Sequence, residues 1–247
     1  MKKHLFLLSL SAIALAGCTS TDVIEEGVQS NAIGFTNSIA KPSRSIDDAK
    51  DGDLTTETLD DIYVYGYYTM SNQQATAVQV FDGTEVSKNS NGVWTYTNTR
   101  YWVPNAKYFF YAYSCGDTQL KNTFGTPTLA IANDNTRVLR FSNYTCDNSH
   151  QHDLIYAFNE GIIGQSPTSE TPNSKVNFQF KHILTKINAR FISEFDATYK
   201  VIVSNVRVVN IRNMGNYDPK QNDDYKWNSV DRSGAYKFVS LTVSTEG

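Results

Sequence analysis

Two segments of this chain are apolar on both faces of an extended strand, and this constrains the fold more than any other feature. In residues 60–69, Ile62, Val64, Gly66 and Tyr68 alternate with three further tyrosines, and residues 107–114 are similarly aromatic. Aromatic and β-branched residues favour sheets. Because successive side chains point to opposite faces, a strand with no polar face must be covered on both sides. We therefore expect strands buried between layers.

Short strand-like segments recur along the chain, separated by turn residues, and no 3.6-residue periodicity of useful length appears after the N-terminal region. This pattern predicts an all-β protein of the β-sandwich class. Asn91-Gly92 is typical of a hairpin turn. In residues 175–191 the apolar phase changes near His182-Ile183, which predicts a β-bulge there. The alternative is two strands with a tight break between them.

Composition and motifs exclude several function classes. The chain has 22 basic and 25 acidic residues, and its net charge of −3 gives no indication of the clustered basic surface that binds nucleic acid. Aromatic residues make up 13% of the chain, which excludes disorder of the whole chain. No nucleotide-binding, phosphate-binding or hydrolase motif is found. We therefore expect no enzymatic activity and no cofactor.

The histidines are weak candidates for a metal site, and the tryptophans are weak candidates for a sugar-binding site. His150, His152 and Asp153 lack a fourth ligand, so no metal site is predicted, and the two histidines are expected to be solvated in a polar loop. His182 lies among core-facing residues and is expected to be a hydrogen-bonded, partly buried histidine. Trp94 and Trp102 flank turns and offer flat rings for a sugar, although the core is the simpler place for them.

The N-terminus carries an export signal. Lys2 and Lys3 precede an apolar run, Leu5 to Leu15, which is too short to span a bilayer. The run ends in Leu15-Ala16-Gly17-Cys18, which resembles the lipobox of bacterial lipoproteins. Residues 1–17 are therefore predicted to be a lipoprotein signal peptide, and Cys18 is predicted to carry the lipid. A plain secretory peptide with a chance cysteine is the alternative.

Cys115 and Cys146 are the other two cysteines. An exported compartment permits a disulfide, and closing a loop of about thirty residues would contribute roughly 3–4 kcal/mol. The sequence leaves the pairing open, because it does not show that the two side chains meet.

The mature chain divides into three predicted parts. Residues 18–49 are polar and read as a tether with a short removable strand around Ala32, Ile33 and Phe35. Residues 50–197 form the N-terminal β-sandwich. Residues 198–247 are too few for an ordinary sandwich, so they are expected to be the start of a truncated second β domain, unless they add to the first domain's sheets.

An ordered series of segments resembles a known family. The lipobox is followed by four aromatic strands and, later, by motifs at Asp153–Ala157, Val176–Ile187 and Val206–Ile211. The aromatic strands are Ile62–Tyr68, Gly92–Tyr96, Tyr101–Pro104 and Tyr108–Tyr113. Together these segments resemble the fimbrillin-like (Mfa-like) pilus proteins of Bacteroidetes-type bacteria.

The resemblance implies a type V pilus subunit that is exported as an outer-membrane lipoprotein and built from two transthyretin-like β-sandwiches. In polymerising members an arginine-directed protease removes the first strand, and a strand of another subunit fills the groove. Carried to this chain, the resemblance implies a cut between Arg44 and Ser45 and a removable strand that contains Ala32, Ile33 and Phe35. Complete members carry a full second domain.

The leading hypothesis is therefore a surface-exposed, lipid-anchored fimbrial subunit, structural or accessory, that assembles by strand addition and mediates adhesion. Its expected partners are other fimbrial subunits, the outer membrane and ligands on host or bacterial surfaces. The alternative is a surface glycan-binding lipoprotein that uses exposed aromatic residues such as Trp94 or Trp102. A glycan binder would expose those rings, whereas a pilus subunit would bury them and pack an N-terminal strand in a groove.

Overall fold

The computed structural model describes the parts of the chain that form its sheets. These are residues 31–39, 54–70, 77–116, 128–131, 137–146, 152–165, 175–187, 191–192, 194, 202–219, 227–229 and 233–237. All of them lie in one compact unit, Asn31–Gly247. Every regular element in these ranges is a strand, which confirms the all-β prediction. Within the same ranges, no helix is long and apolar enough to cross a membrane.

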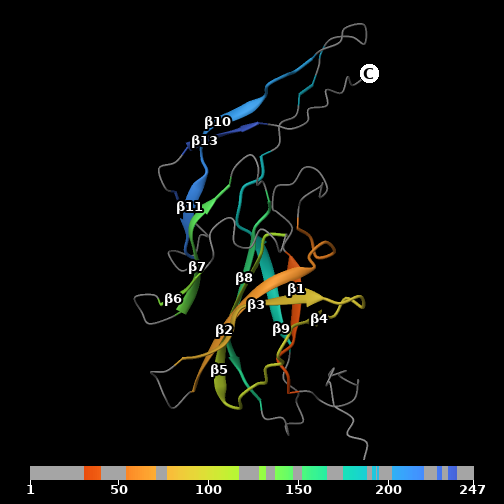
Figure 1. Cartoon of the computed structure of the whole chain (residues 1–247), viewed down its shortest axis with the longest axis vertical. Helices are drawn as coiled ribbons and strands as arrows, with labels where there is room; N and C mark the ends of the chain where they lie inside the picture. The colour runs from red at the N-terminus through yellow and green to blue at the C-terminus, as the bar shows by residue number, and fades with distance from the viewer. Residues whose placement is uncertain are drawn as a thin grey trace, which may run out of the picture. The chain divides into compact units, whose positions relative to one another are not determined.

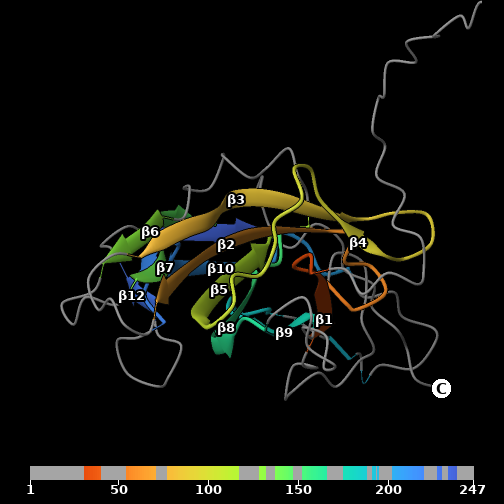
Figure 2. The ribbon, with the colours of Figure 1, turned by 90° about the horizontal axis from the view of Figure 1, so that it is seen from below.

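The largest element is a seven-stranded sheet with the order β1-β9-β8-β5-β2-β3-β4. Its strands are β1 (Phe35–Ile39), β9 (Val176–His182), β8 (Ile155–Ile163), β5 (Ala106–Ser114), β2 (Asp61–Met70), β3 (Val78–Lys88) and β4 (Trp94–Thr95). The β1–β9 pair is parallel, and every other pair in this sheet is antiparallel. Figures 1 and 2 show β2, β5 and β8 at the centre of this sheet.

A second sheet of four strands has the order β12-β11-β7-β6. Its strands are β6 (Thr128–Ile131), β7 (Arg137–Thr145), β11 (Met214–Tyr217) and β12 (Trp227–Ser229). The strands β10 (Arg207–Arg212) and β13 (Ser233–Lys237) form a separate pair. The strand β11 therefore pairs with β7 on one side and with β12 on the other. The predicted boundary near residue 198 stays a prediction.

One face of the seven-stranded sheet carries a core that we call the phenylalanine cluster. It contains Phe35, Phe81, Phe110, Phe178 and Phe180, each no more than 3% exposed. Its other buried members are aliphatic or aromatic: Ile33, Leu54, Leu59, Ile62, Val64, Val86, Trp102, Ala106, Tyr108, Ala112, Ile155, Ala157 and Val176. Gly66 is needed here, because a Cβ at that position would lie 2.8 Å from Cδ1 of Phe110.

The opposite face carries the tyrosine cluster, which the four-stranded sheet covers. Its buried members are Tyr63, Tyr65, Tyr67, Tyr111, Tyr113, Cys115, Leu139, Phe141, Tyr144, Leu154, Tyr156, Ile183 and Tyr217. Phe141 of β7 packs edge-on against Tyr113 of β5, with ring centroids 5.3 Å apart. The two sheets therefore stack face to face, consistent with a transthyretin-like sandwich, and β2 and β5 are buried on both faces as the sequence predicted.

Two local predictions can be compared with the strands. Asn89 and Val93 pair across the turn that contains Gly92, whose φ is +74°, so the predicted hairpin between β3 and β4 is confirmed. The predicted bulge at His182-Ile183 is wrong, because β9 ends at His182 and the pairing with β8 has no register shift there. Ile183 instead enters the tyrosine cluster. The end of the strand therefore accounts for the change of phase.

Candidate functional site

The candidate site is the groove that β1 occupies at the border of the large sheet. All five residues of β1 are in parallel register with β9, from Phe35 opposite Val176 to Ile39 opposite Phe180. The amide of Val176 donates to the carbonyl of Gly34 at 2.8 Å. A short N-terminal segment is therefore held by the main chain of a strand about 140 residues away, as Figure 1 shows for the red β1 beside the teal β9.

The side chains of this segment fill the phenylalanine cluster. Ile33 is 1% exposed and Phe35 is 3% exposed, whereas the intervening Thr36 and Ser38 of β1 face outward. The Phe35 ring stacks on Phe178 at 5.7 Å and contacts three other rings edge-on: Phe81, Tyr96 and Phe110. Burying a phenylalanine contributes roughly 2–3 kcal/mol. The segment is therefore part of the core rather than an appendage on it.

The opposite side of the same segment is bonded to the connection between β4 and β5. The amide of Ile33 donates to the carbonyl of Arg100 at 2.8 Å, and the amide of Trp102 donates to the carbonyl of Asn31 at 3.0 Å. Ala32 forms a bridge with Tyr101. Residues 31–39 thus receive main-chain hydrogen bonds from both borders of the seven-stranded sheet and nearly close it.

Two aromatic side chains complete this contact. The indole Nε1 of Trp94 donates to Oδ1 of Asn37 at 3.0 Å, and the hydroxyl of Tyr96 donates to the carbonyl of Ile33 at 2.7 Å. Burial raises the pKa of Tyr96 further above neutral pH, which is consistent with its hydroxyl acting as a donor. These two hydrogen bonds end on the side-chain amide of Asn37 and the main-chain carbonyl of Ile33, and they help to fix the position of residues 31–39.

The strand β9 depends on β1 for most of its pairing. It is paired with β8 at only two positions, Ile155 with His182 and Tyr156 with Lys181. Farther along, the side-chain amide of Asn159 donates to the carbonyl of Asn177 at 3.1 Å. Removing β1 would therefore leave one side of β9 as an unpaired template for another strand.

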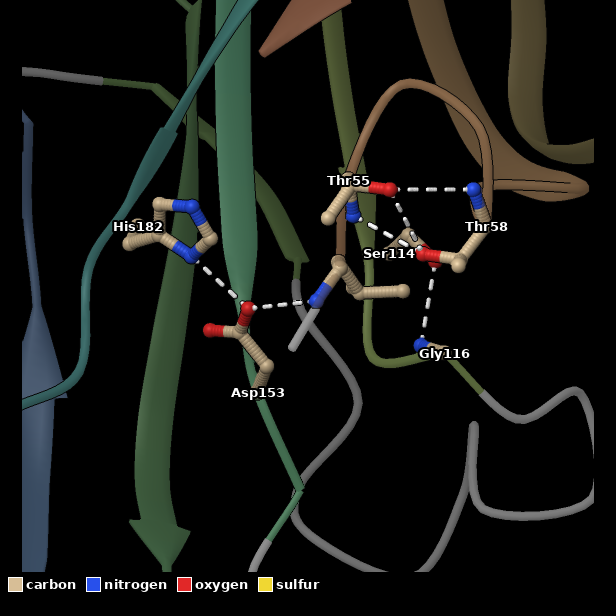
Figure 3. A network of polar contacts seen from close by, with 7 residues as sticks. Thr55, Thr58, Ser114, Gly116, Asp153 and His182 are labelled. Carbon is tan, nitrogen blue, oxygen red and sulfur yellow. Dashed lines mark hydrogen bonds and ion pairs between the residues drawn. The ribbon is translucent and has the colours of Figure 1, made fainter. Parts of the chain in front are cut away.

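A set of polar contacts, which we call the clasp, joins Leu54, Asp153 and His182. Oδ2 of Asp153 accepts the amide of Leu54 at 3.1 Å and lies 2.7 Å from Nδ1 of His182 (Figure 3). The side chains of Asp153 and His182 are only 13% and 15% exposed. The prediction of a satisfied, partly buried His182 is confirmed. A turn closed by Thr55 and Thr58 follows directly.

The other predicted positions fall in different places. Cys18, Arg44 and Ser45 lie outside the described residues, so lipidation and processing stay predictions. Cys115 and Cys146 both belong to the tyrosine cluster and form no disulfide in the structure. His150 also lies outside the described residues. No group of three metal-ligating side chains occurs in the described part of the chain.

The tryptophans do not present a platform for sugars. Trp102 is 2% exposed and packs against Tyr108, with ring centroids 4.7 Å apart. Trp94 is half-buried and is turned toward β1 by its bond to Asn37. Both rings therefore hold the groove, as expected for the pilus reading and not for the glycan-binding alternative.

Sequence reasoning placed Ile33 and Phe35 in the removable strand but missed the residues that hold them. Asn37 and Asn31 read as ordinary linker residues, and no local signal marks them as bonded to Trp94 and Trp102. Asp153 appeared only as a weak metal ligand, because its contact with Leu54 spans 99 residues of sequence.

This geometry defines a class of protein: a β-sandwich whose sheet is closed by its own N-terminal strand. A family model described as fimbrillin-like matches residues 48–244, a range that begins after β1. The chain belongs to the fimbrillin-like family, which confirms the resemblance.

A solved structure of a fimbrial protein from Bacteroides vulgatus is similar to this chain, with 18% sequence identity and a TM-score of 0.48. The alignment covers 84% of this chain and 62% of that protein, so this chain spans less than two thirds of its length. A comparison with curated protein sequences returns no match.

Proposed function

We propose that this protein is a fimbrial subunit in which β1 is exchanged for an extended segment of a neighbouring subunit. The observation that carries the proposal is the position of residues 31–39, which are bonded on both sides and contribute Phe35 to the core. A strand fixed by main-chain bonds and alternate side chains can be replaced by any segment with the same pattern. Membership of the fimbrillin-like family supports the same role.

Processing after Arg44 would make this exchange irreversible. Arg44 lies in the segment between β1 and Leu54, so a cut there separates β1 from the rest of the chain. After the cut, the contacts of Asp153 with Leu54 and His182 would still hold Leu54, which lies on the C-terminal side of Arg44. The remaining sandwich would keep its other strands and expose the groove.

The lipid anchor belongs to the same proposal. We expect Cys18 to carry the lipid and to retain the protein at the outer membrane before processing, with fimbriae and surface adhesion as the outcome. Mass spectrometry of the N-terminus from cells checks this point. An acylated Cys18 supports the anchored form, a start at Ser45 supports processing, and an unmodified Cys18 or a start elsewhere contradicts the respective step.

Strand exchange is tested by treating the full chain with an arginine-specific protease and following oligomers by light scattering and electron microscopy. We expect loss of the N-terminal fragment and formation of oligomers, and neither in Arg44→Ala. Lys41→Ala is the matched control, because it removes a nearby charge and leaves the arginine. Processed protein that remains monomeric at high concentration would contradict the proposal.

A second experiment uses synthetic peptides to test whether the groove recognises the sequence of the N-terminal strand. A synthetic peptide of residues 31–40 should bind processed protein and block its oligomerisation. A Phe35→Ala peptide should bind at least tenfold more weakly, because it loses the buried ring. A Thr36→Ala peptide changes an outward residue and should bind like the original. Equal binding by all three peptides would show that the groove does not recognise the strand.

A further inference from the structure

Cys115 and Cys146 follow the ends of strands in two different sheets. Cys115 comes directly after Ser114, the last residue of β5, and Cys146 comes directly after Thr145, the last residue of β7. Strand pairing or a hydrogen bond fixes the main chain at or beside each cysteine. Ser114 is in register with Ile155, and the amide of Cys146 donates to the carbonyl of Asn213 at 2.9 Å.

Both cysteines pack into the same core. Cys115 is 4% exposed and is a buried member of the tyrosine cluster, and the half-buried Cys146 packs against that cluster. The hydroxyl of Tyr144 interacts electrostatically with both thiols. Burial raises its pKa, and the thiols of Cys146 and then Cys115 add to the effect as neighbouring ionisable groups. Two cysteines 31 positions apart in sequence therefore converge on one side chain.

We propose that Cys115 and Cys146 form a disulfide in the exported protein and thereby link the seven-stranded sheet to the four-stranded sheet. The proposal depends on export, which the N-terminal signal predicts, and it does not depend on strand exchange. Both cysteines come directly after the last residue of a strand, and the bond requires their Cβ atoms to lie about 3.5–4.5 Å apart.

The reaction is a thiol–disulfide exchange that occurs while the chain folds, before Cys115 is buried. The two thiols lose two protons and two electrons to the oxidised disulfide of a dithiol oxidase, and that disulfide is reduced to two thiols. In the chain-entropy model, a loop of about thirty residues closed in this way raises the melting temperature of a protein of this size by roughly 10 °C.

The position of the bond has a structural consequence. It lies in the tyrosine cluster and not in the phenylalanine cluster that contains β1. A disulfide there would hold the two sheets together while the other face of the large sheet is opened for a new strand. The disulfide and the replaceable strand β1 would thus lie on opposite faces of the seven-stranded sheet.

The first test uses full-length protein expressed with its own signal and purified without reductant. Denaturation with an alkylating agent, digestion and mass spectrometry should yield a linked peptide pair containing Cys115 and Cys146, with neither thiol alkylated. Cys115→Ala and Cys146→Ala should each abolish the linked pair. Reductant should lower the melting temperature of the original protein and leave that of the double variant unchanged.

The second test separates geometry from export. Reduced, denatured protein is refolded in a mixture of oxidised and reduced glutathione, so that both thiols are accessible while the chain folds. Formation of the internal disulfide supports the proposal. A stable glutathione adduct on Cys146 with an unmodified thiol at Cys115 would show that the sulfurs do not meet and would overturn it. Two alkylated thiols in the exported protein would overturn it as well.

Discussion

The two faces of the seven-stranded sheet are closed by different kinds of cover. The phenylalanine cluster is completed by residues 31–39, a terminal segment whose only regular element is a five-residue strand. The tyrosine cluster is covered by a four-stranded sheet drawn from the middle and the later part of the chain. The five-residue β1 lies at the border of its sheet, whereas the cover of the tyrosine cluster is built from four paired strands.

Polar contacts reinforce this difference. On the tyrosine side, Arg140 of β7 forms an ion pair with the 8%-exposed Asp218 at 2.7 Å. The indole Nε1 of Trp227 also donates to the carbonyl of Ile183, which joins the small sheet to the chain after β9. On the β1 side, Trp94 donates to Asn37 of β1 and Tyr96 donates to the carbonyl of Ile33, two residues before β1. We call the face that carries the tyrosine cluster the permanent face, and the face where strand exchange is proposed the exchangeable face.

The largest expected effect tests whether the groove floor is a true core. Phe180→Asp buries an unpaired charge in the phenylalanine cluster, where Phe180 is fully buried. We expect a loss of about 4 kcal/mol or more in the free energy of unfolding, measured by denaturant titration. Gln179→Asp is the matched control, because Gln179 is the adjacent outward residue of β9. Equal stability of the two variants would contradict the core assignment.

A smaller effect is expected on the permanent face. Asp218→Asn keeps the shape of the side chain and leaves Arg140 without its anionic partner. Because the Arg140 side chain is 32% exposed, the cost should be about 2 kcal/mol, below that of a fully buried pair. Denaturant unfolding measures it, with Asp60→Asn at an exposed position as control. A neutral result would mean that the ion pair does not help to hold the small sheet.

The smallest effect at neutral pH concerns the tyrosine hydroxyls. Burial, with a smaller contribution from Asp82, raises the pKa of Tyr65 from 10.0 to about 12. Above pH 10 the unfolded state loses this proton while the folded state keeps it, so stability present below pH 10 is lost as pH rises toward 12.

Tyr65→Phe should therefore reduce the fall in unfolding free energy across this range, and Tyr101→Phe, at an exposed tyrosine, should not. Denaturant titrations at several alkaline pH values provide the measurement. An identical pH dependence for Tyr65→Phe and the original protein would show that this cluster does not make the permanent face sensitive to alkali.

Local pattern carried much of this architecture. The strands β2 and β5 were predictable as buried on both faces, because alternation has a period of two and their tyrosines and aliphatic residues leave no polar face. The apolar patch at Ala32, Ile33 and Phe35 was enough, with the family resemblance, to predict a strand that fills a groove. The turn at Gly92 followed from the Asn-Gly pair.

Other features depend on contacts between distant residues and left no local trace. The change of phase at His182-Ile183 predicted a bulge, with a break as the alternative, and only the pairing with Leu154 and Ile155 shows that the strand ends there. The bond from Trp94 to Asn37 likewise required the two borders of the sheet to be brought together.

The sequence by itself determined that this protein is built from strands, which of their faces are apolar and which segments begin and end at turns, because these properties follow from side chains within a few residues of one another. Only the tertiary structure decided that β1 lies parallel to β9, that β11 joins β7 and that the two cysteines share one core. Strand partners are chosen by the burial of whole faces and by main-chain bonds across long separations, which neighbouring residues do not specify.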